Sequence, residues 1–282
     1  MAVSKYSDIS SFVASIYERS LFVARENNLM TQLVRNFSAS GWSPRVLSIR
    51  PTAVAATVAD GADFAGTATW NKSSLATLTP SEVIGQYILT DQQIETDPDG
   101  AVTDASLELG NAVATKIDTD LTSAFTSFTT DKGPGAGSAV TIAKLASAVS
   151  VLRNNKAPAP IYAVLHPYHW HDVWVLLGQP AATYSNLGEA TNAALRDFYV
   201  NSMLGIQFFT NANIAVDAND DAVSGIFNSQ AIGFDTRRAP RMEEERDASL
   251  RATELNLTAG YAYGVIRNTF GVKFTADATE PS

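Results

Sequence analysis

The chain has 282 residues, carries a formal net charge of −9 at pH 7 and contains no cysteine. The lack of thiols excludes disulfides, thiolate zinc sites and Cys-ligated iron–sulfur clusters, and the acidic balance argues against a general nucleic-acid binder. Apolar residues make up 45% of the chain, enough to bury a core, yet no run approaches the roughly 18 apolar residues of a membrane helix, and the first residues lack the pattern of a signal peptide.

The N-terminal part of the chain shows the apolar spacing of a helix. The spacing occurs in two stretches, so we expect an opening helical segment with a break near residues 27–28. Its apolar positions are Ile9, Phe12, Val13 and Ile16, followed by Leu29, Met30, Leu33 and Val34.

Residues 46–89 change to Ala, Thr, Val and Ser with β-like alternation, and Asp60-Gly61 is a hairpin signal between the two halves. Large apolar side chains are rare here: between residues 51 and 69 only Val54, Val58 and Phe64 exceed alanine or threonine in apolar bulk. Because a lone hairpin is marginal in water, we expect this ribbon to lie against something else. It either packs on its own domain or is laid on a neighbouring subunit, and composition favours neither.

A long amphipathic helix is predicted from about residue 104 to residue 128, with Lys116, Asp118 and Asp120 staying polar. The segment Asp131–Gly137 then breaks the chain. Its glycines resemble a phosphate loop only superficially, since they follow a helix and lack a Gly-Lys-Ser/Thr ending, so we expect a flexible connector. The apolar stripe that we assign to the core is Val113, Ile117, Leu121, Phe125 and Phe128.

Helices and strands alternate after this break. One helix beginning at Pro167 has Trp170, Val173, Trp174 and Leu177 on one face. The remaining elements are expected as helices over residues 142–152 and 190–200, strands at 161–165, 206–209 and 225–234, and long C-terminal β structure at 255–265 that changes phase near Asn268 and continues at 270–274.

The three histidines, His166, His169 and His171, invite a metal site, but the spacing opposes one. On a helix His169 and His171 point to opposite faces, and His166 precedes a proline and belongs to the strand end. We therefore expect capping and surface packing. The chain also lacks a Gly-x-Ser-x-Gly elbow, and the pair Asp97 and Asp99 fits a solvated turn, so we predict no catalytic, cofactor-binding or metal site.

The densest charge lies between Arg237 and Arg251, a window without lysine. It could be a solvated strand face. It could instead form ion pairs across a subunit contact, where the forked guanidinium of arginine specifies geometry, and the absence of lysine favours this second interpretation modestly.

Six segments, taken in order, resemble the major capsid proteins of tailed phages, whose Hong Kong 97-type fold encapsulins share. No single segment is diagnostic, and their order and spacing over nearly the whole chain carry the resemblance. The segments are Tyr17–Met30, Ala59–Phe64, Gly110–Asp118, Tyr162–Pro167, Met203–Phe209 and Tyr261–Ile266.

The resemblance implies an α+β fold divided as in that family. The N-terminal arm would occupy residues 1–44 and an extended β-hairpin loop residues 45–80. A peripheral domain with a long spine helix would combine 81–137 with 236–282, and an axial α/β domain would occupy 138–235.

The resemblance further implies a non-enzymatic shell subunit, without cofactors, that assembles into hexamers and pentamers of an icosahedral phage head around double-stranded DNA. Its partners would be itself, a portal, and separate scaffolding or decoration proteins, with no membrane; it would be made in the host cytoplasm and reside in the virion. The residues we expect at subunit interfaces are Phe64, Trp70, Lys72, Arg237, Arg238, Arg241, Glu243, Glu244, Glu245 and Arg246.

Two features depart from the family, and two alternatives stay open. Many members begin with a scaffolding extension, whereas here the arm starts near Met1, so scaffolding would be a separate protein or this chain would be the processed form. Lys72, the one lysine in the loop, has no identifiable crosslinking partner. An encapsulin-type compartment would have the same fold. A soluble metal-dependent α/β enzyme built on residues 166–171 is the remote alternative.

Overall fold

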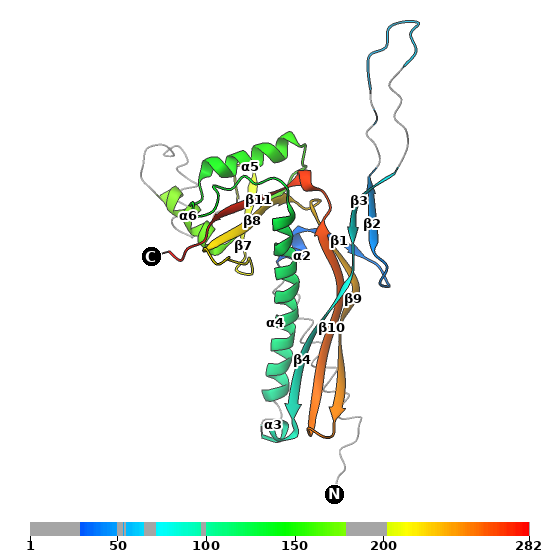
Figure 1. Cartoon of the computed structure of the whole chain (residues 1–282), viewed down its shortest axis with the longest axis vertical. Coiled ribbons are helices and arrows are strands. Elements are labelled where there is room, and N and C mark those ends of the chain that lie inside the picture. Colours follow the sequence, from blue (N-terminus) through cyan, green and yellow to red (C-terminus); the bar gives the residue numbers. More distant parts are fainter. Residues whose placement is uncertain are drawn as a thin grey trace.

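The computed structural model describes residues 29–49, 53, 55–64, 72–96, 100–178 and 202–281. The chain forms two bodies and a long projecting arm (Figure 1). One body is a tall sheet beside a long helix. The other is a smaller sheet with helices, and it lies at the end of the tall body that is away from α3 (Asp91–Thr96). The expected helices at residues 9–16 and 190–200, together with Trp70, Asp97 and Asp99, lie outside the described residues.

The tall sheet has four strands in the order β1-β9-β10-β4. Strand β1 pairs parallel to the beginning of β9, whereas β10 lies antiparallel to both β9 and β4. A short helix α2 precedes β1, and α3 follows β4. Their bounds are α2 Met30–Leu33, β1 Arg35–Ser38, β4 Ser81–Thr90, α3 Asp91–Thr96, β9 Ile232–Asp247 and β10 Ala252–Val265.

Helix α4 (Gly100–Ser123) runs along one face of this sheet and continues as the 3-10 turn η1 (Ala124–Ser127). Its apolar stripe is buried as predicted, from Val113 through Leu121 to Phe125. Helix and strand approach closely at Gly85 of β4, where a Cβ would lie 3.3 Å from a methyl of Leu109. Asp118, which the sequence placed among the polar positions of this helix, is a buried polar residue that is 1% exposed.

The second body is built on a five-stranded sheet with the order β11-β8-β5-β7-β6. The helix α5 begins after Thr141, whose hydroxyl accepts a hydrogen bond from the Lys144 amide, as an N-cap does. Apolar residues of α5 and α6, among them Leu145 and Val173, pack on the sheet. The bounds are α5 Ile142–Asn154, β5 Ile161–Leu165, α6 Pro167–Gly178, β6 Ser202–Met203, β7 Ile206–Thr210, β8 Asp221–Asn228 and β11 Gly271–Asp277.

The single strand expected at residues 225–234 is two strands that belong to different sheets. A turn ends β8, where Asn228 accepts a hydrogen bond through its carbonyl from the Ala231 amide and through its side chain from the Gln230 amide. Such local bonding by asparagine is a turn signal, and it was missed inside an apolar run. The phase change near Asn268 is confirmed: η3 (Asn268–Phe270) lies between β10 in the tall sheet and β11 in the second.

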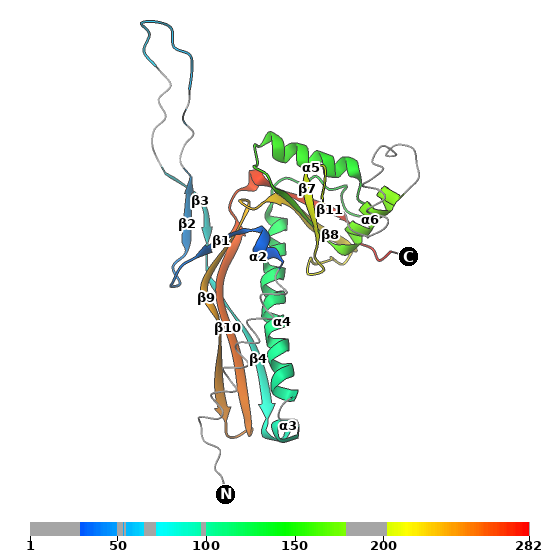
Figure 2. The ribbon, with the colours of Figure 1, turned by 180° about the vertical axis from the view of Figure 1, so that it is seen from behind.

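The arm begins with β2 (Arg45–Ile49), returns through β3 (Ser73–Leu78), and has its turn at Asp60-Gly61, where the Ala62 amide donates to the Ala59 carbonyl at 3.0 Å. Gly61 adopts φ +77°, which a residue with a side chain rarely does. The arm projects away from both bodies when viewed from either side (Figures 1 and 2). Residues 55–64 are all exposed, so packing of this segment on its own domain, one of the two interpretations from sequence, is wrong.

Candidate functional site

The tip of the arm presents apolar side chains to solvent. Val58 is 41% exposed and Phe64 is 38% exposed, and both flank the acidic turn that contains Asp60 and Asp63. Lys72 is also exposed, at the end of the described part of the arm's return. Val58, Phe64 and Lys72 are thus accessible from outside the subunit.

The base of the arm, by contrast, packs firmly on the tall sheet. Leu78, the last residue of β3, is buried, and its methyls would lie 3.2 Å from a Cβ placed at Gly233 or Gly264. Trp42, in the connection between β1 and β2, lies 3.0 Å from the Cβ position of Gly260, and the Arg238 guanidinium sits 5.2 Å from the centre of its ring. Glycines on β9 and β10 thus make room for the arm's base.

A buried carboxylate lies at the same junction. Asp235 of β9 is 0% exposed, and both its oxygens accept hydrogen bonds from Arg45, the first residue of β2, at 2.7 and 3.2 Å. Arg237 adds a third contact at 2.8 Å. Sequence reasoning missed Asp235 and Arg45; the available signal was an aspartate that directly follows the apolar run 232–234 on a strand.

The charged window lies on β9, and the structure divides its side chains between the two faces of the sheet. Glu244 stands opposite the core residue Leu255, on the side of α4. Glu243 and Glu245 stand opposite Asn256 and Glu254, on the outer face, and both are exposed. The three consecutive glutamates therefore do not form one surface.

Four arginines of this window are paired within the chain, Arg237 with Asp235 as described above. Arg238 bonds Glu82 at 2.6 Å, Arg241 bonds Glu243, and Arg246 forms a bidentate pair with Asp91 at 2.6 Å for both bonds. The Arg246 hydrogen bond lowers the pKa of the Asp91 carboxyl below its usual value. Since these pairs are largely exposed, each adds little to stability. The arm beyond β2 and β3 projects away from the tall sheet, whose strand β9 carries this window (Figure 1).

The histidines do not form a metal site. His169, expected at a surface, is fully buried: its Nε2 donates to the Ala276 carbonyl at 3.1 Å, and its Nδ1 accepts from the Ser224 hydroxyl at 2.8 Å. The tautomer follows, because a carbonyl only accepts. His166 Nδ1 accepts from the Tyr168 amide at 3.3 Å, the capping role that was expected. Across the described ranges, no three His, Asp or Glu side chains gather as a metal would require.

The glycine-rich segment after η1 is tied down rather than flexible, which corrects the sequence prediction. The Gly135 amide donates to the Thr275 carbonyl at 3.1 Å, and the Gly137 amide donates to Asp221 at 2.7 Å. A Cβ at Gly133 would lie 2.0 Å from the Thr275 oxygen, so only glycine lets the segment lie this close to β11. These backbone donors are used internally, which leaves no phosphate cradle.

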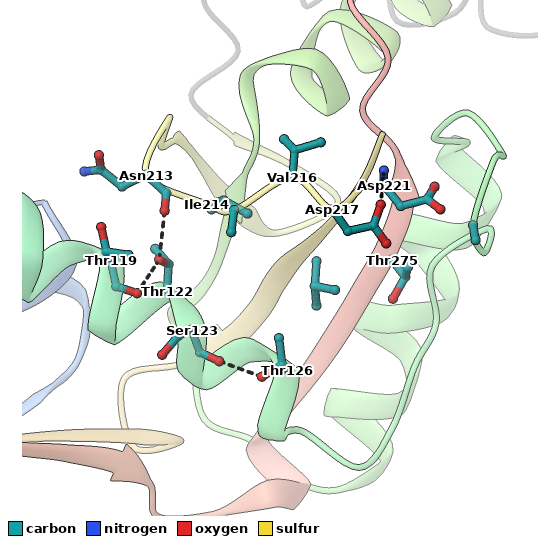
Figure 3. A pocket seen from close by; sticks show the side chains of 13 residues that line it. Thr119, Thr122, Ser123, Thr126, Asn213, Ile214, Val216, Asp217, Asp221 and Thr275 are labelled. Atoms are coloured by element: carbon teal, nitrogen blue, oxygen red, sulfur yellow. Dashed lines mark hydrogen bonds between the residues drawn. The ribbon is translucent and has the colours of Figure 1, made fainter. Parts of the chain in front are cut away.

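A cavity of about 330 Å³ opens between the end of α4 and the loop before β8 (Figure 3). Its hydroxyls bond their own chain: Thr122 to the Thr119 carbonyl at 2.9 Å, Ser123 to Asp120 at 2.6 Å, and Thr126 to Ser123 at 2.8 Å. Asp217 accepts from the Asn219 and Asp221 amides, which lower the pKa of its carboxyl. The two carboxylates of the lining, Asp217 and Asp221, accept from backbone amides, and none of the three hydroxyls above bonds to either of them.

None of the helices in the described ranges has the length and apolar character of a membrane span.

Comparison with known proteins points to one kind of protein. A family model described as phage capsid protein matches residues 76–278, which is more than half of the chain. No curated protein matches the chain.

The chain is also similar in structure to three solved particles. The match to the capsid of the cyanophage P-SCSP1u has a TM-score of 0.69 and 15% identity, and covers 88% of this chain and 87% of that one. The match to Mycobacterium phage Che8 has a TM-score of 0.65 and 18% identity, and covers 88% and 90%. The match to the virus-like particle from Pyrococcus furiosus has a TM-score of 0.60 and 9% identity, and covers 92% and 97%.

Proposed function

The chain belongs to the phage capsid protein family and is a major capsid subunit with the Hong Kong 97-like α+β fold, and from this premise we propose that it assembles into hexamers and pentamers of an icosahedral head around double-stranded DNA. The single observation that supports this most is the exposed, projecting arm, whose apolar tip has no surface to cover within its own subunit. The arm would lie on a neighbouring subunit, with Phe64, Trp70 and Lys72 in or near the contact.

The family division gives each body a role in such a shell. The N-terminal arm would be residues 1–44, the extended loop 45–80, the peripheral domain 81–137 with 236–282, and the axial domain 138–235. The tall sheet with α4 and the smaller sheet support a division into two bodies. The proposed boundary at 235 falls inside β9, and β11 returns to pair with β8.

The outer face of β9 is proposed as a second contact. Glu245 stands directly opposite Glu254, and like charges in that position destabilise a sheet. A cation from another subunit would relieve this repulsion. Arg237, Arg238, Arg241 and Arg246, which were also expected here, form ion pairs within the chain. The contact would therefore depend on the exposed glutamates, of which Glu243 also pairs with Arg241.

Charge reversal tests this contact. Glu243→Lys with Glu245→Lys should prevent or slow assembly in low salt, where close charge pairs matter most. Glu95→Lys with Glu280→Lys makes the same change of charge at exposed positions elsewhere and should leave assembly unchanged. Light scattering reports both; equal assembly of the two double variants in low salt would remove the β9 contact from the proposal.

The partners follow from the same role. A head of this family would need a portal, and scaffolding or decoration proteins would be separate chains. Residues 60–130 hold eleven acids and two bases, and if that charge lined the lumen it would keep packaged DNA from adhering. The protein would be made in the host cytoplasm, reside in the virion and carry out no catalysis.

Purification of the recombinant chain, followed by light scattering over a concentration series and negative-stain imaging, tests the proposal. Closed shells or capsomer rings are expected. Nucleic acid inside particles from infected cells would support a phage head, whereas protein cargo would indicate an encapsulin-type compartment. The structural similarity to a virus-like particle is the reason to test this alternative. A subunit that stays monomeric even with a scaffold, and holds metal that His169→Ala removes, would favour the enzyme instead.

A further inference from the structure

We propose that Arg45, Asp235 and Arg237 form a latch that sets the direction of the arm relative to the tall sheet before the subunit meets a neighbour. The inference rests on the proposed role of the arm in assembly. Arg45 opens the first strand of the arm, and Asp235 lies on β9 where β1 pairs beside it (Figure 2). The latch therefore joins the arm to the body at the arm's base. A small rotation at the base displaces the tip by a large distance, because the whole length of the arm lies between them.

Both arginines contact Oδ2 of the carboxylate, but they differ in burial and in the element from which they come. The Arg237 side chain is 6% exposed and comes from the same strand as Asp235, whereas the Arg45 side chain is 26% exposed and comes from the arm. If Arg45 leaves, Asp235 keeps one guanidinium and is not left as a bare buried charge, which would be very costly. A variant that lacks the Arg45 guanidinium therefore tests the arm without leaving an unpaired buried charge in the body.

Neighbouring contacts hold the Arg45 side chain in place. Its guanidinium lies 5.0 Å from the centre of the Phe37 ring, and Nη2 also donates to the Ser38 carbonyl at 3.1 Å. Phe37 and Ser38 belong to β1, so Arg45 contacts both strands that flank the junction, β1 and β9. A bidentate guanidinium fixes an angle as well as a distance, which a lysine at this position would not do.

A fixed direction matters because an arm that is free to swing must be ordered at the moment of contact. Pre-ordering lowers that cost and so strengthens and speeds the association. The latch would thus act as a positioning device for assembly, and Asp235 would serve the contact without touching the neighbouring subunit.

The absence of cysteine makes a direct measurement simple, because two introduced thiols are the only ones. Spin labels at Ser48→Cys on β2 and Glu108→Cys on α4 would report the angle of the arm's base in dilute, unassembled subunits. Both positions are exposed. The otherwise unchanged chain should give one narrow distance distribution.

Arg45→Met keeps the aliphatic stem over Phe37 and removes the guanidinium. In this variant the distribution of distances between the two labels should broaden, while the thermal unfolding midpoint stays near that of the parent. Arg241→Met, which also removes an arginine from an ion pair but lies far along β9 from the arm, should leave the distribution narrow. A distribution in Arg45→Met that is as narrow as the parent's would overturn the latch.

The two proposals can fail separately. Parent subunits that form shells, with an unchanged distribution in Arg45→Met, would refute the latch and leave the capsid function standing. Parent subunits that never assemble, with a broadened distribution in Arg45→Met, would support the latch as a feature of the subunit and refute its use in a shell.

Discussion

Asp118 is a buried carboxylate that joins three parts of the molecule. It accepts hydrogen bonds from the Met30 amide at 3.0 Å, from the Asn213 side chain at 3.0 Å and from the Asn211 side chain. Met30 begins α2, Asp118 lies on α4, and the two asparagines follow β7 in the second body. The position of one side chain therefore couples the N-terminal segment to both bodies.

Removal of this carboxylate should destabilise the subunit. Asp118→Ala leaves buried donors without an acceptor and should lower the free energy of unfolding by about 3 kcal/mol, whereas Asp118→Asn, which keeps one acceptor, should cost roughly half of that. Lys116→Ala breaks the exposed pair with Asp120 on the same helix and should cost less than about 0.5 kcal/mol. Urea unfolding measures all three, and similar losses in the Ala variants would refute the role of Asp118.

His169 should make stability depend on pH. Burial lowers its pKa from 6.5 to about 4, in a site that also faces His166, Asp221 and Asp277. In the unfolded chain the ring takes up a proton near pH 6.5, but in the folded chain only near pH 4, so the unfolded state binds more protons between these values. Stability is therefore full above pH 6.5 and falls by about 1.4 kcal/mol per pH unit below it, to a total near 3 kcal/mol.

Urea unfolding between pH 7 and pH 4 checks the expected slope. His169→Gln keeps hydrogen-bonding groups without the titration, so its stability should fall less steeply over this window. Other groups that titrate there, including His166, whose pKa burial also lowers, act on both proteins alike. Identical slopes for the two proteins would contradict the assignment.

These residues show where sequence reasoning stops. The positions of His169 on a helix and His166 at a strand end followed from spacing, but the burial of His169 did not. Asp118 lies 88 residues from Met30 and 93 from Asn211 along the chain, so the local sequence around Asp118 cannot identify the groups that donate to it. Asp235 and Arg45, which are 190 residues apart, were missed for the same reason.

At the scale of the elements, the arm should be separable from the body. Residues 55–64 are all exposed, so a chain in which residues 53–72 are replaced by a short turn should have a free energy of unfolding within about 0.5 kcal/mol of the parent's. The same chain should fail to assemble, because the apolar tip that would cover a neighbour is gone.

Light scattering and urea unfolding of the shortened chain test both halves of this prediction. Phe64→Ser, a change at the tip alone, should weaken assembly with the same small effect on folding. Normal shells from the shortened chain would show that the arm makes no contact that assembly needs.

Elements with a regular spacing of apolar residues could be predicted from the sequence. Elements whose structure depends on contacts with distant residues could not. The stripe of α4 and the phase change before β11 followed from spacing alone. The boundary between β8 and β9 was lost because an apolar run continues through the turn at Asn228. Likewise the ordered segment 133–137 depends on contacts with Thr275 and Asp221, more than eighty residues later.

At the scale of the whole molecule, the order of the segments was the informative signal. Composition excluded thiol chemistry and favoured a folded chain. It did not distinguish a ribbon packed on its own domain from one laid on a neighbouring subunit. Because residues 55–64 are exposed on a projecting arm, packing of these residues on their own domain is excluded. The small side chains of this ribbon therefore lie in an arm that projects from its own subunit.

Cryo-electron microscopy of particles assembled from the full chain tests the central claim most directly. We predict an icosahedral shell in which residues 55–64 of each subunit lie on an adjacent subunit while Arg45 still contacts Asp235 of its own β9 at the arm's base. Particles in which the arm folds back on its own body, or a chain that forms no closed shell under any assembly condition, would contradict it.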